Sequence, residues 1–345
     1  MADAAWTSFE AWLAERRFEH PPLRLAEFAE TGRGLMATED LEVGDAVVKV
    51  PARLLLTQQR TTRLFGGSKA IAGLKQHASI SLFLAWHAAL GYSEWAPYID
   101  TASKQRRNME ADHASVQDAL ATVDSEPLSA ALSLAPSTTG LQERAQALIT
   151  KNLFVWAWLV VNTRCITLNT DASAAQSLLD KQPRIALAPF LDCLNHTPIS
   201  RIQAGLDRAD RAYVIRTLVA YPKGSQVFIN YGPHDNAFLL SEYGFVVSEN
   251  PYNHVCLDAE MDCILQRMPS AKSILVAEDY TVSRDDIGYR FLNAMRLMVA
   301  ASRTDDRGLL MLVPSWRKIL NGETSHMSED LEALVITNVQ RLLQE

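Results

Sequence analysis

Two short stretches constrain this chain most, because each ends a hydrophobic run in a cluster of polar residues. The first is residues 188–196, which read Ala-Pro-Phe-Leu-Asp-Cys-Leu-Asn-His. In the second, Val227, Phe228 and Ile229 form a β-branched and aromatic run that predicts a strand, and Tyr231 follows at its end. Because strand ends hold side chains rigidly, the two stretches together predict one pocket suited to chemistry.

A turn and a short helix are predicted after this strand. Gly232 and Pro233 break the strand. Asp235 or Asn236 can then cap a helix over residues 237–242, which a glycine follows.

Three further blocks precede or separate these stretches. They are Thr-Gly-Arg-Gly-Leu at residues 31–35, Trp-Ala-Pro-Tyr-Ile-Asp at 95–100 and Val-Asn-Thr-Arg at 161–164. In order and rough spacing the five blocks resemble the SET-domain methyltransferases, over roughly residues 5–300. The layout resembles the branch typified by the Rubisco large-subunit methyltransferase, and residues 231–236 look closest to the SET-domain-containing protein 4 group.

The resemblance implies an α+β fold. We expect a SET-domain β fold with a knot-like C-terminal part, split by a helical insertion and followed by a helical substrate-binding domain. The implied parts are a first part of the SET domain with an N-terminal helix (1–56), the insertion (57–161), the second part of the SET domain (162–254) and the substrate-binding domain (255–345).

The resemblance also implies S-adenosylmethionine as cofactor and a protein substrate with an accessible lysine, histone or non-histone. Tyr231 corresponds to the catalytic tyrosine. The implied cofactor-binding residues are Arg33, Leu35, Thr163, Arg164, Asp192, Asn195, His196 and Tyr231. The implied substrate-binding residues are Ile166, Asp192, Tyr243 and Phe245. Two positions depart from the family pattern: Gln226 replaces an acid, and Thr163 replaces a serine.

Methyl transfer from a sulfonium to an amine requires a neutral nitrogen held behind the methyl carbon. An apolar, aromatic channel lowers the pKa of a lysine by removing it from water, so no strong base is needed. Tyr231 suits the centre of such a site, and Tyr243 and Phe245 suit its walls.

The same branch includes members that modify histidine, which is the main alternative for the acceptor. Selecting an imidazole calls for a polar partner that fixes its tautomer. The residue two positions after Arg164 lies near the acceptor in the resembled family, and here it is Ile166. Isoleucine offers an apolar wall and no hydrogen bond, which favours lysine.

Composition excludes several other classes of protein. The chain has 345 residues, of which 48% are hydrophobic and 21% charged, as expected for a globular protein of two or three units. The formal charge of −7 gives no basic footprint, so we expect no direct nucleic-acid binding. No signal peptide or membrane-length apolar run is evident, which predicts a soluble intracellular protein of the nucleus or the cytoplasm.

Two rival functions remain open. Asp192, His196, His234 and Asp235 carry the right atoms for a metallohydrolase, but Asp192 and His196 lie beside a proline-bounded strand rather than on a clear helix that would give them a shared face. The four cysteines lack C-x-x-C spacing, and we expect no bound metal. The other rival is a catalytically silent SET scaffold that binds a protein partner.

Locally, the N-terminal region predicts a helix and three strands. One face of the helix is formed by Trp6, Phe9, Leu13 and Arg17. Thr7 and Glu10 fit a capping box. The strands are expected at 23–28, 35–38 and 45–50, around a turn that contains Gly32 and Gly34 but lacks the full Rossmann fingerprint.

The rest of the chain is mostly helical outside the motif stretches. Residues 114–140 predict surface helix and loop, residues 171–182 a polar connection, and residues 329–343 a last helix. An apolar helical stripe is formed by Ile287, Phe291, Leu292, Met295, Leu297 and Met298.

Overall fold

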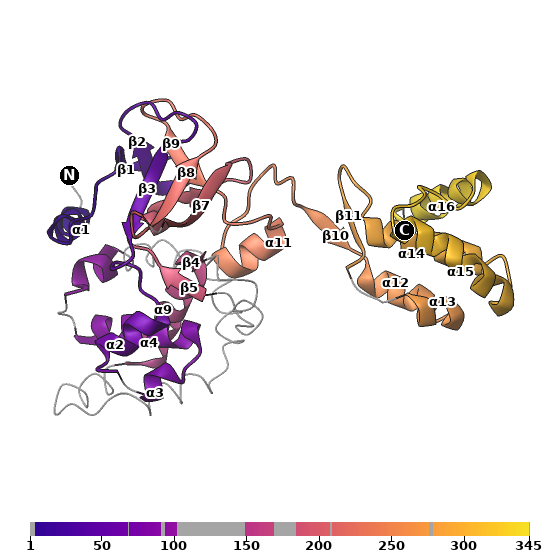
Figure 1. Cartoon of the computed structure of the whole chain (residues 1–345), viewed down its shortest axis with the longest axis horizontal. Helices are drawn as coiled ribbons and strands as arrows, with labels where there is room; N and C mark the ends of the chain where they lie inside the picture. Colours follow the sequence, from indigo (N-terminus) through magenta and orange to yellow (C-terminus); the bar gives the residue numbers. More distant parts are fainter. Residues whose placement is uncertain are drawn as a thin grey trace. The chain divides into compact units, whose positions relative to one another are not determined.

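The structure, a computed structural model, describes residues 4–67, 69–90, 94–101, 149–168, 184–207, 209–275 and 279–344. The chain divides into two compact units, Met1–Glu249 and Asn250–Glu345 (Figure 1). The surface helix predicted at 114–140 and the polar connection predicted at 171–182 lie outside the described residues.

The first unit contains a four-stranded sheet in the order β1-β2-β9-β6. Its strands are β1 (Leu23–Phe28), β2 (Gly32–Ala37), β9 (Gln226–Ile229) and β6 (Asn195–His196). β2 pairs antiparallel with β1 and β9, whereas β6 runs parallel to β9. Because a parallel pair joins residues far apart in sequence, this contact brings the two motif stretches together.

Two smaller sheets and several helices accompany this sheet. The remaining strands are β3 (Ala46–Pro51), β8 (Ala212–Thr217) and β7 (Ile202–Asp207) in one sheet, and β4 (Cys165–Leu168) with β5 (Arg184–Leu187) in another. The helices are α1 (Ala4–Glu15), α2 (Gln58–Leu64), α3 (Lys69–Ala72), α4 (Gln76–Leu90), α9 (Lys151–Arg164) and α11 (Asn236–Phe238). Figure 1 shows α2, α3, α4 and α9 gathered at one end of the unit.

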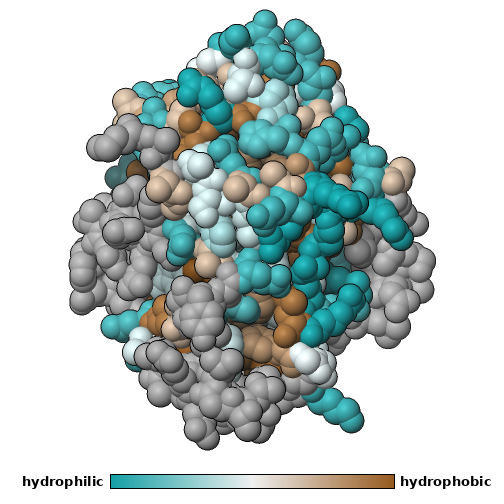
Figure 2. Space-filling view, turned by 90° about the vertical axis from the view of Figure 1, so that its left-hand side faces the viewer, coloured by the Kyte–Doolittle hydropathy of each residue, from teal (hydrophilic) through white to brown (hydrophobic). Residues whose placement is uncertain are grey.

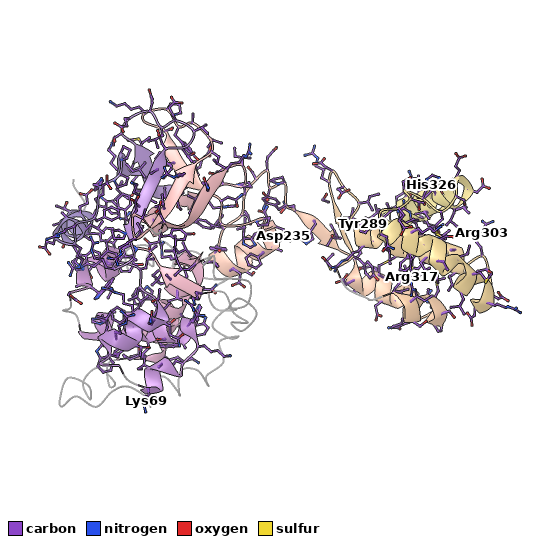
Figure 3. The ribbon with its side chains drawn as sticks, viewed as in Figure 1. Lys69, Asp235, Tyr289, Arg303, Arg317 and His326 are labelled. Carbon is purple, nitrogen blue, oxygen red and sulfur yellow. The ribbon has the colours of Figure 1, made fainter. Side chains whose placement is uncertain are left out.

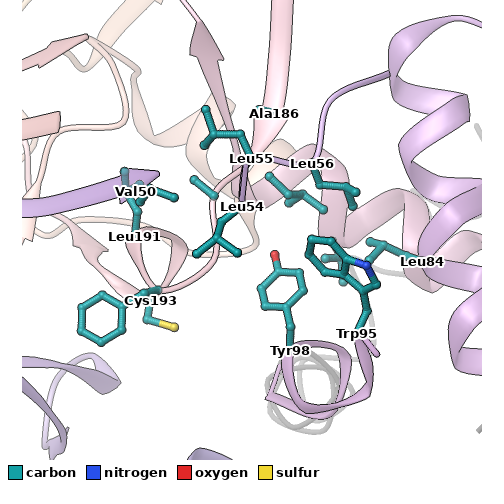
Figure 4. Close-up of a cluster of buried hydrophobic side chains, with 14 of the residues drawn as sticks. Val50, Leu54, Leu55, Leu56, Leu84, Trp95, Tyr98, Ala186, Leu191 and Cys193 are labelled. Carbon is teal, nitrogen blue, oxygen red and sulfur yellow. The ribbon is translucent and has the colours of Figure 1, made fainter. Parts of the chain in front are cut away.

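One hydrophobic core joins these sheets and helices. Trp95 and Tyr98, which are almost fully buried, pack among Leu54, Leu56 and Leu84 (Figure 4). The two aromatic rings meet edge-on with their centroids 6.4 Å apart. Full burial of a large apolar side chain contributes about 1.5–3 kcal/mol, so the block at 95–100 is a major part of the core.

The coloured surface is mainly polar. On the face drawn in Figure 2, hydrophilic residues predominate and hydrophobic ones show in patches between them. In the part of the chain that the structure describes, no helix is both long enough and apolar enough to cross a membrane.

The N-terminal helix differs from its prediction at both ends. α1 already includes Thr7 as an interior residue, so the predicted capping box with Glu10 is wrong. Arg17 is also wrong as a member of the buried face, because it lies beyond the helix with a φ of 51° and is exposed. The buried face consists of Trp6, Phe9, Trp12 and Leu13.

The predicted turn at residues 32–34 is wrong as well, because β2 begins at Gly32. Gly32 has a φ of 65°, which favours glycine as the chain returns from β1. Gly34 pairs with Ala26 inside the strand. The strand predicted at 23–28 is confirmed, and the one predicted at 45–50 lies one residue later, as β3.

The second unit is a group of helices with a small two-stranded antiparallel sheet. Its elements are β10 (His254–Cys256), α12 (Asp258–Leu265), α13 (Pro269–Ile274), β11 (Thr281–Ser283), α14 (Tyr289–Ala301), α15 (Asp306–Leu320) and α16 (Glu329–Leu342). α14 packs against both α15 and α16. Most of the predicted stripe lies on α14, but Ile287 precedes the helix and is 37% exposed, so its place in the stripe is wrong.

A buried ion pair links two of these helices. Arg296 on α14 donates through Nε and Nη2 to both carboxylate oxygens of Glu332 on α16, at 2.8 and 3.0 Å. Its Nη1 donates to Asn293 Oδ1 at 2.9 Å, and its Nη2 also donates to the carbonyl of Ser325. Such a bidentate pair fixes the angle and register of two helices.

We expect Arg296→Met to destabilise the second unit, because it leaves the Glu332 carboxylate without its partner. The loss should be on the order of 3 kcal/mol, measured by urea unfolding followed by far-ultraviolet circular dichroism. The control is Arg303→Met, just after the same helix and exposed (Figure 3). Equal stability of the two variants would show that the pair contributes nothing.

Candidate functional site

The Asn195–His196 pair is positioned by a short turn and by a parallel strand contact. η1 (Leu191–Cys193), a single 3₁₀ turn, carries Asp192 and is followed closely by β6. β6 pairs with β9, and Tyr231 follows β9 by two residues. The two motif stretches predicted to share a pocket therefore meet in one place.

The turn η1 starts from a strained backbone. Phe190 has φ 75° and ψ −49°, a region that side chains other than glycine rarely adopt, at a cost of about 1–3 kcal/mol. Its fully buried ring packs against Phe18, His20 and Trp6, with centroid distances of 5.2, 5.3 and 5.9 Å. Packing against N-terminal residues thus holds the turn that aims Asp192.

Asp192 is the centre of a buried polar cluster. Its side chain is 2% exposed and accepts a hydrogen bond from the Tyr98 hydroxyl at 2.8 Å. Arg164 Nη1 lies 3.9 Å from the same carboxylate oxygen and donates to the backbone carbonyl of Asp192. Burial raises the pKa of Asp192, and the Arg164 guanidinium and Tyr98 hydroxyl oppose that rise. Through these contacts the carboxylate links Tyr98 and Arg164 within the core.

The Asn195 amide bonds to the strand β2. Its Nδ2 donates to the carbonyl of Arg33 at 2.9 Å. The amides of Asn195 and Gln226 both face Gly34, where a Cβ would lie 2.9 Å from Asn195 Nδ2 and closer still to Gln226 Nε2. Thr31 donates to Gln226 Oε1 at 2.7 Å, but Gln226 Nε2 is buried without a hydrogen-bond partner among the described residues.

His196 is linked to Tyr231 through the backbone. The Tyr231 N–H donates to His196 Nδ1 at 3.0 Å, so the neutral ring carries its proton on Nε2. Nε2 is buried and has no hydrogen-bond partner in the described part of the chain. Burial, together with neighbouring His234, lowers the pKa of His196 to about 4, so the ring is neutral at pH 7.

The Tyr231 phenol is held at its oxygen. The hydroxyl donates to the carbonyl of Leu194 at 2.7 Å. Burial raises the pKa of Tyr231, so the phenol stays protonated. Its oxygen therefore offers lone pairs to an incoming donor rather than acting as a base.

Tyr231, Tyr243 and Phe245 form an aromatic cluster beside His196. Centroid distances are 5.2 Å from Tyr231 to Tyr243, 6.4 Å from Tyr231 to Phe245 and 6.1 Å from Tyr243 to Phe245. The His196 ring lies 5.9 Å from Phe245. Three of the predicted site residues, His196, Tyr243 and Phe245, thus lie around the phenol of Tyr231.

The segment that carries Tyr243 is an unusual helix. Asp235 caps α11 by accepting from the Phe238 N–H at 2.8 Å, which confirms the predicted cap. The chain then continues as a π-helical turn, η2 (Leu239–Tyr243), and ends at Gly244 with a φ of 80°. Single π-helical turns occur often at functional sites.

The remaining predicted residues lie nearby in different settings. The Leu35 side chain is fully buried in the core, so only its backbone can face a ligand. Thr163 Oγ1 donates to the carbonyl of Leu159 at 2.8 Å within α9. Ile166 lies in β4, half-buried, two residues after Arg164.

Sequence reasoning missed three residues that tie the site together. Tyr98 lies in a recognised block but received no role, although a buried acid such as Asp192 needs a donor. Asn162 Nδ2 donates to Glu242 Oε2 at 2.8 Å and connects α9 with η2. No local pattern signals that pair, which spans 80 positions.

Among the described residues, buried hydrogen-bond donors mark the site. In the described ranges no group of three or more His, Cys, Asp or Glu side chains is close enough to hold a metal ion. His234 stacks on Phe238 with centroids 4.1 Å apart. The buried N–H group of Gln226 beside Gly34, and that of His196 beside Tyr231, fit S-adenosylmethionine, which presents several hydrogen-bond acceptors.

Comparison with known proteins places these features in a family context. The family model of the SET domain matches residues 32–232. SET domain-containing protein 4 of Mus musculus is 32% identical, with 90% of this chain and 74% of that protein aligned. Ribosomal lysine N-methyltransferase set11 of Schizosaccharomyces pombe is 23% identical, with 84% of this chain and 74% of that protein aligned.

A solved structure shares the fold. It is the crystal structure of the SET domain of LSMT bound to lysine and AdoHcy, with a TM-score of 0.61 and 19% identity. The likeness covers 99% of this chain and 80% of that one.

We expect the first unit to lose stability as the pH falls from 6.5 to 4. Burial lowers the pKa values of His77, His87 and His196 to about 4, whereas the unfolded chain takes up these protons below pH 6.5. The unfolded state therefore binds more protons in this window, at up to about 1.4 kcal/mol per pH unit for each histidine.

His196→Gln should make this pH dependence shallower, because glutamine accepts from the Tyr231 N–H without titrating. Urea unfolding followed by tryptophan fluorescence reports mainly this unit, since every tryptophan except Trp316 belongs to it. His326→Gln, at an exposed position of the second unit (Figure 3), is the control. Identical slopes for wild type and His196→Gln would refute the buried neutral ring.

Proposed function

The chain belongs to the SET-domain family, and on that premise we propose that it transfers a methyl group from S-adenosylmethionine to a lysine side chain of a protein substrate. The observation that carries the proposal is the aromatic cluster of Tyr231, Tyr243 and Phe245 beside the Asn195–His196 pair. An amide-lined region next to an aromatic channel is what a polar cofactor and an aliphatic amine require together.

The proposed cofactor site lies along β2, the end of α9, η1 and β6. S-adenosylmethionine, when bound, supplies a methyl group carried on a sulfonium sulfur. His196 Nε2 and Gln226 Nε2 would donate to acceptors of the cofactor, and the backbone at Arg33 and Leu35 would face its adenosine end. The side-chain set that would hold the cofactor comprises Arg33, Thr163, Arg164, Asn195, His196, Gln226 and Tyr231, with Asp192 acting through Arg164.

The proposed acceptor site is the aromatic cluster, with Ile166 as a further apolar wall. Apolar walls exclude water, which lowers the pKa of a lysine and favours its neutral form. The Tyr231 hydroxyl proton is bonded to the Leu194 carbonyl, so the phenol oxygen accepts from an amine N–H and orients the nitrogen. Positioning and water exclusion, rather than a strong base, do the catalytic work.

We expect Tyr231→Phe to keep the fold and, because the ring at this position remains, the cofactor affinity, but to lower turnover about a hundredfold. Only the oxygen that orients the amine is removed, and losing one preorganised polar group has an effect of this size. Tyr213→Phe is the control, because Tyr213 is a buried tyrosine of β8 outside the site. Near-normal turnover of Tyr231→Phe would assign Tyr231 to packing.

Labelled methyl transfer into a cell extract, followed by mass spectrometry of the modified residue, tests the function as a whole. We expect the label on a lysine of a protein. A label on histidine would show that the acceptor is not lysine, whereas the proposed methyl transfer would stand. Failure to bind S-adenosylmethionine in calorimetry would instead favour the silent scaffold.

The second unit is proposed to bind the protein substrate. It contains a cavity of about 530 Å³ lined by residues of α13, α14 and α15 and by Leu275, which directly follows α13; Tyr289, Trp316, Arg317 and Leu320 are among the others. Figure 3 shows Tyr289 and Arg317 in this unit. A cavity with aromatic and apolar walls suits a large side chain of a partner protein.

We expect Leu320→Gln to raise the KM of the protein substrate several-fold, because Leu320 lines the cavity and is 40% exposed. The KM of a short peptide that carries the same lysine should not change. Leu310→Gln is a matched control on the same helix, 64% exposed and outside the cavity lining. Equal KM values for the two variants would show that the cavity does not take part in substrate binding.

The partner proposed is a protein, histone or non-histone, that meets this enzyme in the nucleus or the cytoplasm. The formal charge of −7 supports a protein partner over direct contact with nucleic acid.

A further inference from the structure

One contact connects the two halves of the proposed site. Asn162 lies on α9 directly before Thr163 and Arg164, at the proposed cofactor end. Its Nδ2 donates to Glu242 Oε2 at 2.8 Å and lies 3.4 Å from the Glu242 backbone carbonyl. Glu242 immediately precedes Tyr243, a wall of the aromatic cluster.

The π-helical turn η2 has little burial of its own to hold it. Leu239 is its buried residue, whereas Leu240 and Ser241 are exposed. Polar bonds fix the segment instead. At its start Asp235 (Figure 3) caps α11, and the Asn236 side chain bonds both backbone groups of Val247, at 2.8 and 3.0 Å. The Asn162–Glu242 bond fixes η2 itself, which lies between Asn236 and Val247.

The direction of Tyr243 depends on the shape of this turn. One residue more or less in a helix rotates the next side chain by about 100°, so relaxation of η2 to an α-helix would carry Tyr243 away from Tyr231. The Tyr231 and Tyr243 rings lie 5.2 Å apart in the present arrangement. A bond that fixes η2 therefore also fixes Tyr243 as a wall of the aromatic cluster.

The charge of Glu242 also needs to be directed. Burial raises the pKa of Tyr243, and the Glu242 carboxylate raises it further, which shows how near that charge lies to the aromatic cluster. A carboxylate that turned toward the cluster would stabilise a lysine ammonium and oppose its deprotonation. Asn162 offers this carboxylate a neutral donor on the side of α9.

We propose that Asn162 is a positioning residue for the acceptor site: by holding Glu242 it fixes Tyr243, and so sets the use of the lysine substrate without contacting it. The inference rests on the proposed function. It assigns no cofactor contact to Asn162, and this separates it from its neighbours Thr163 and Arg164.

Reciprocal variants of the pair test the proposal. Asn162→Asp puts two carboxylates face to face and breaks the bond. Glu242→Gln keeps a hydrogen bond between two amides. The double variant Asn162→Asp with Glu242→Gln restores an amide–carboxylate bond with donor and acceptor exchanged, so it should recover what the first variant loses.

The first readout is kinetic, with a peptide that carries the lysine identified by labelling. For Asn162→Asp we expect kcat/KM to fall about tenfold, with the Kd of S-adenosylmethionine within about twofold of wild type. The double variant and Glu242→Gln should lie within about threefold of wild type. A drop in cofactor affinity equal to the drop in kcat/KM, or no recovery in the double variant, would overturn the proposal.

The second readout does not depend on activity. Amide hydrogen exchange of residues 239–243 should be faster in Asn162→Asp and return to the wild-type rate in the double variant. Unchanged exchange in Asn162→Asp would overturn the positioning role. Absence of lysine methylation by the wild type, with the exchange pattern as expected, would instead refute the proposed function and leave the structural link standing.

Discussion

The first unit depends on the contacts that the buried Asp192 carboxylate makes with Tyr98 and Arg164. Removing such a charge from water costs several kcal/mol, and only well-placed partners offset that cost. Here the partners are the Tyr98 hydroxyl and the Arg164 guanidinium, from two distant blocks of the sequence. Loss of Arg164 would leave the Asp192 charge without a counter-ion in the core, and loss of Tyr98 would leave it one hydrogen bond short. One acid therefore joins the core block at 95–100, the end of α9 and the turn that leads to Asn195.

Backbone constraints complete the arrangement. The positive φ of Phe190 is tolerated because its ring is packed by N-terminal aromatic side chains, so residues far from the site shape η1. Gly34 has the opposite role: its missing Cβ leaves room for the amides of Asn195 and Gln226. The strained backbone of Phe190 and the missing side chain of Gly34 hold and make room for the polar side chains of the site. Some donors of these side chains have no hydrogen-bond partner among the described residues. Strain and close approach of this kind are expected where a ligand is to be held.

The family, the α+β SET fold and the strand that delivers Tyr231 could be predicted from the sequence, because motif order and alternation are local signals. The knot-like crossing, the domain limits and the roles of the site residues stay predictions. The errors have physical reasons. Threonine is a residue type that often caps a helix, but α1 begins before Thr7 because Trp6 already belongs to the buried helix face. Long-range polar pairs such as Asn162 with Glu242 leave no periodic trace.

The geometry around Tyr231 also limits how a proton can leave the acceptor. The Tyr231 hydroxyl proton is bonded to a carbonyl, and burial raises the pKa of the phenol, so a phenolate is not at hand. His196 accepts the Tyr231 N–H on Nδ1, and its low pKa makes it a poor proton acceptor. Neither group can deprotonate an ammonium. The lysine must therefore lose its proton before attack, and turnover should rise with pH as the amine is neutralised, until another step limits the rate.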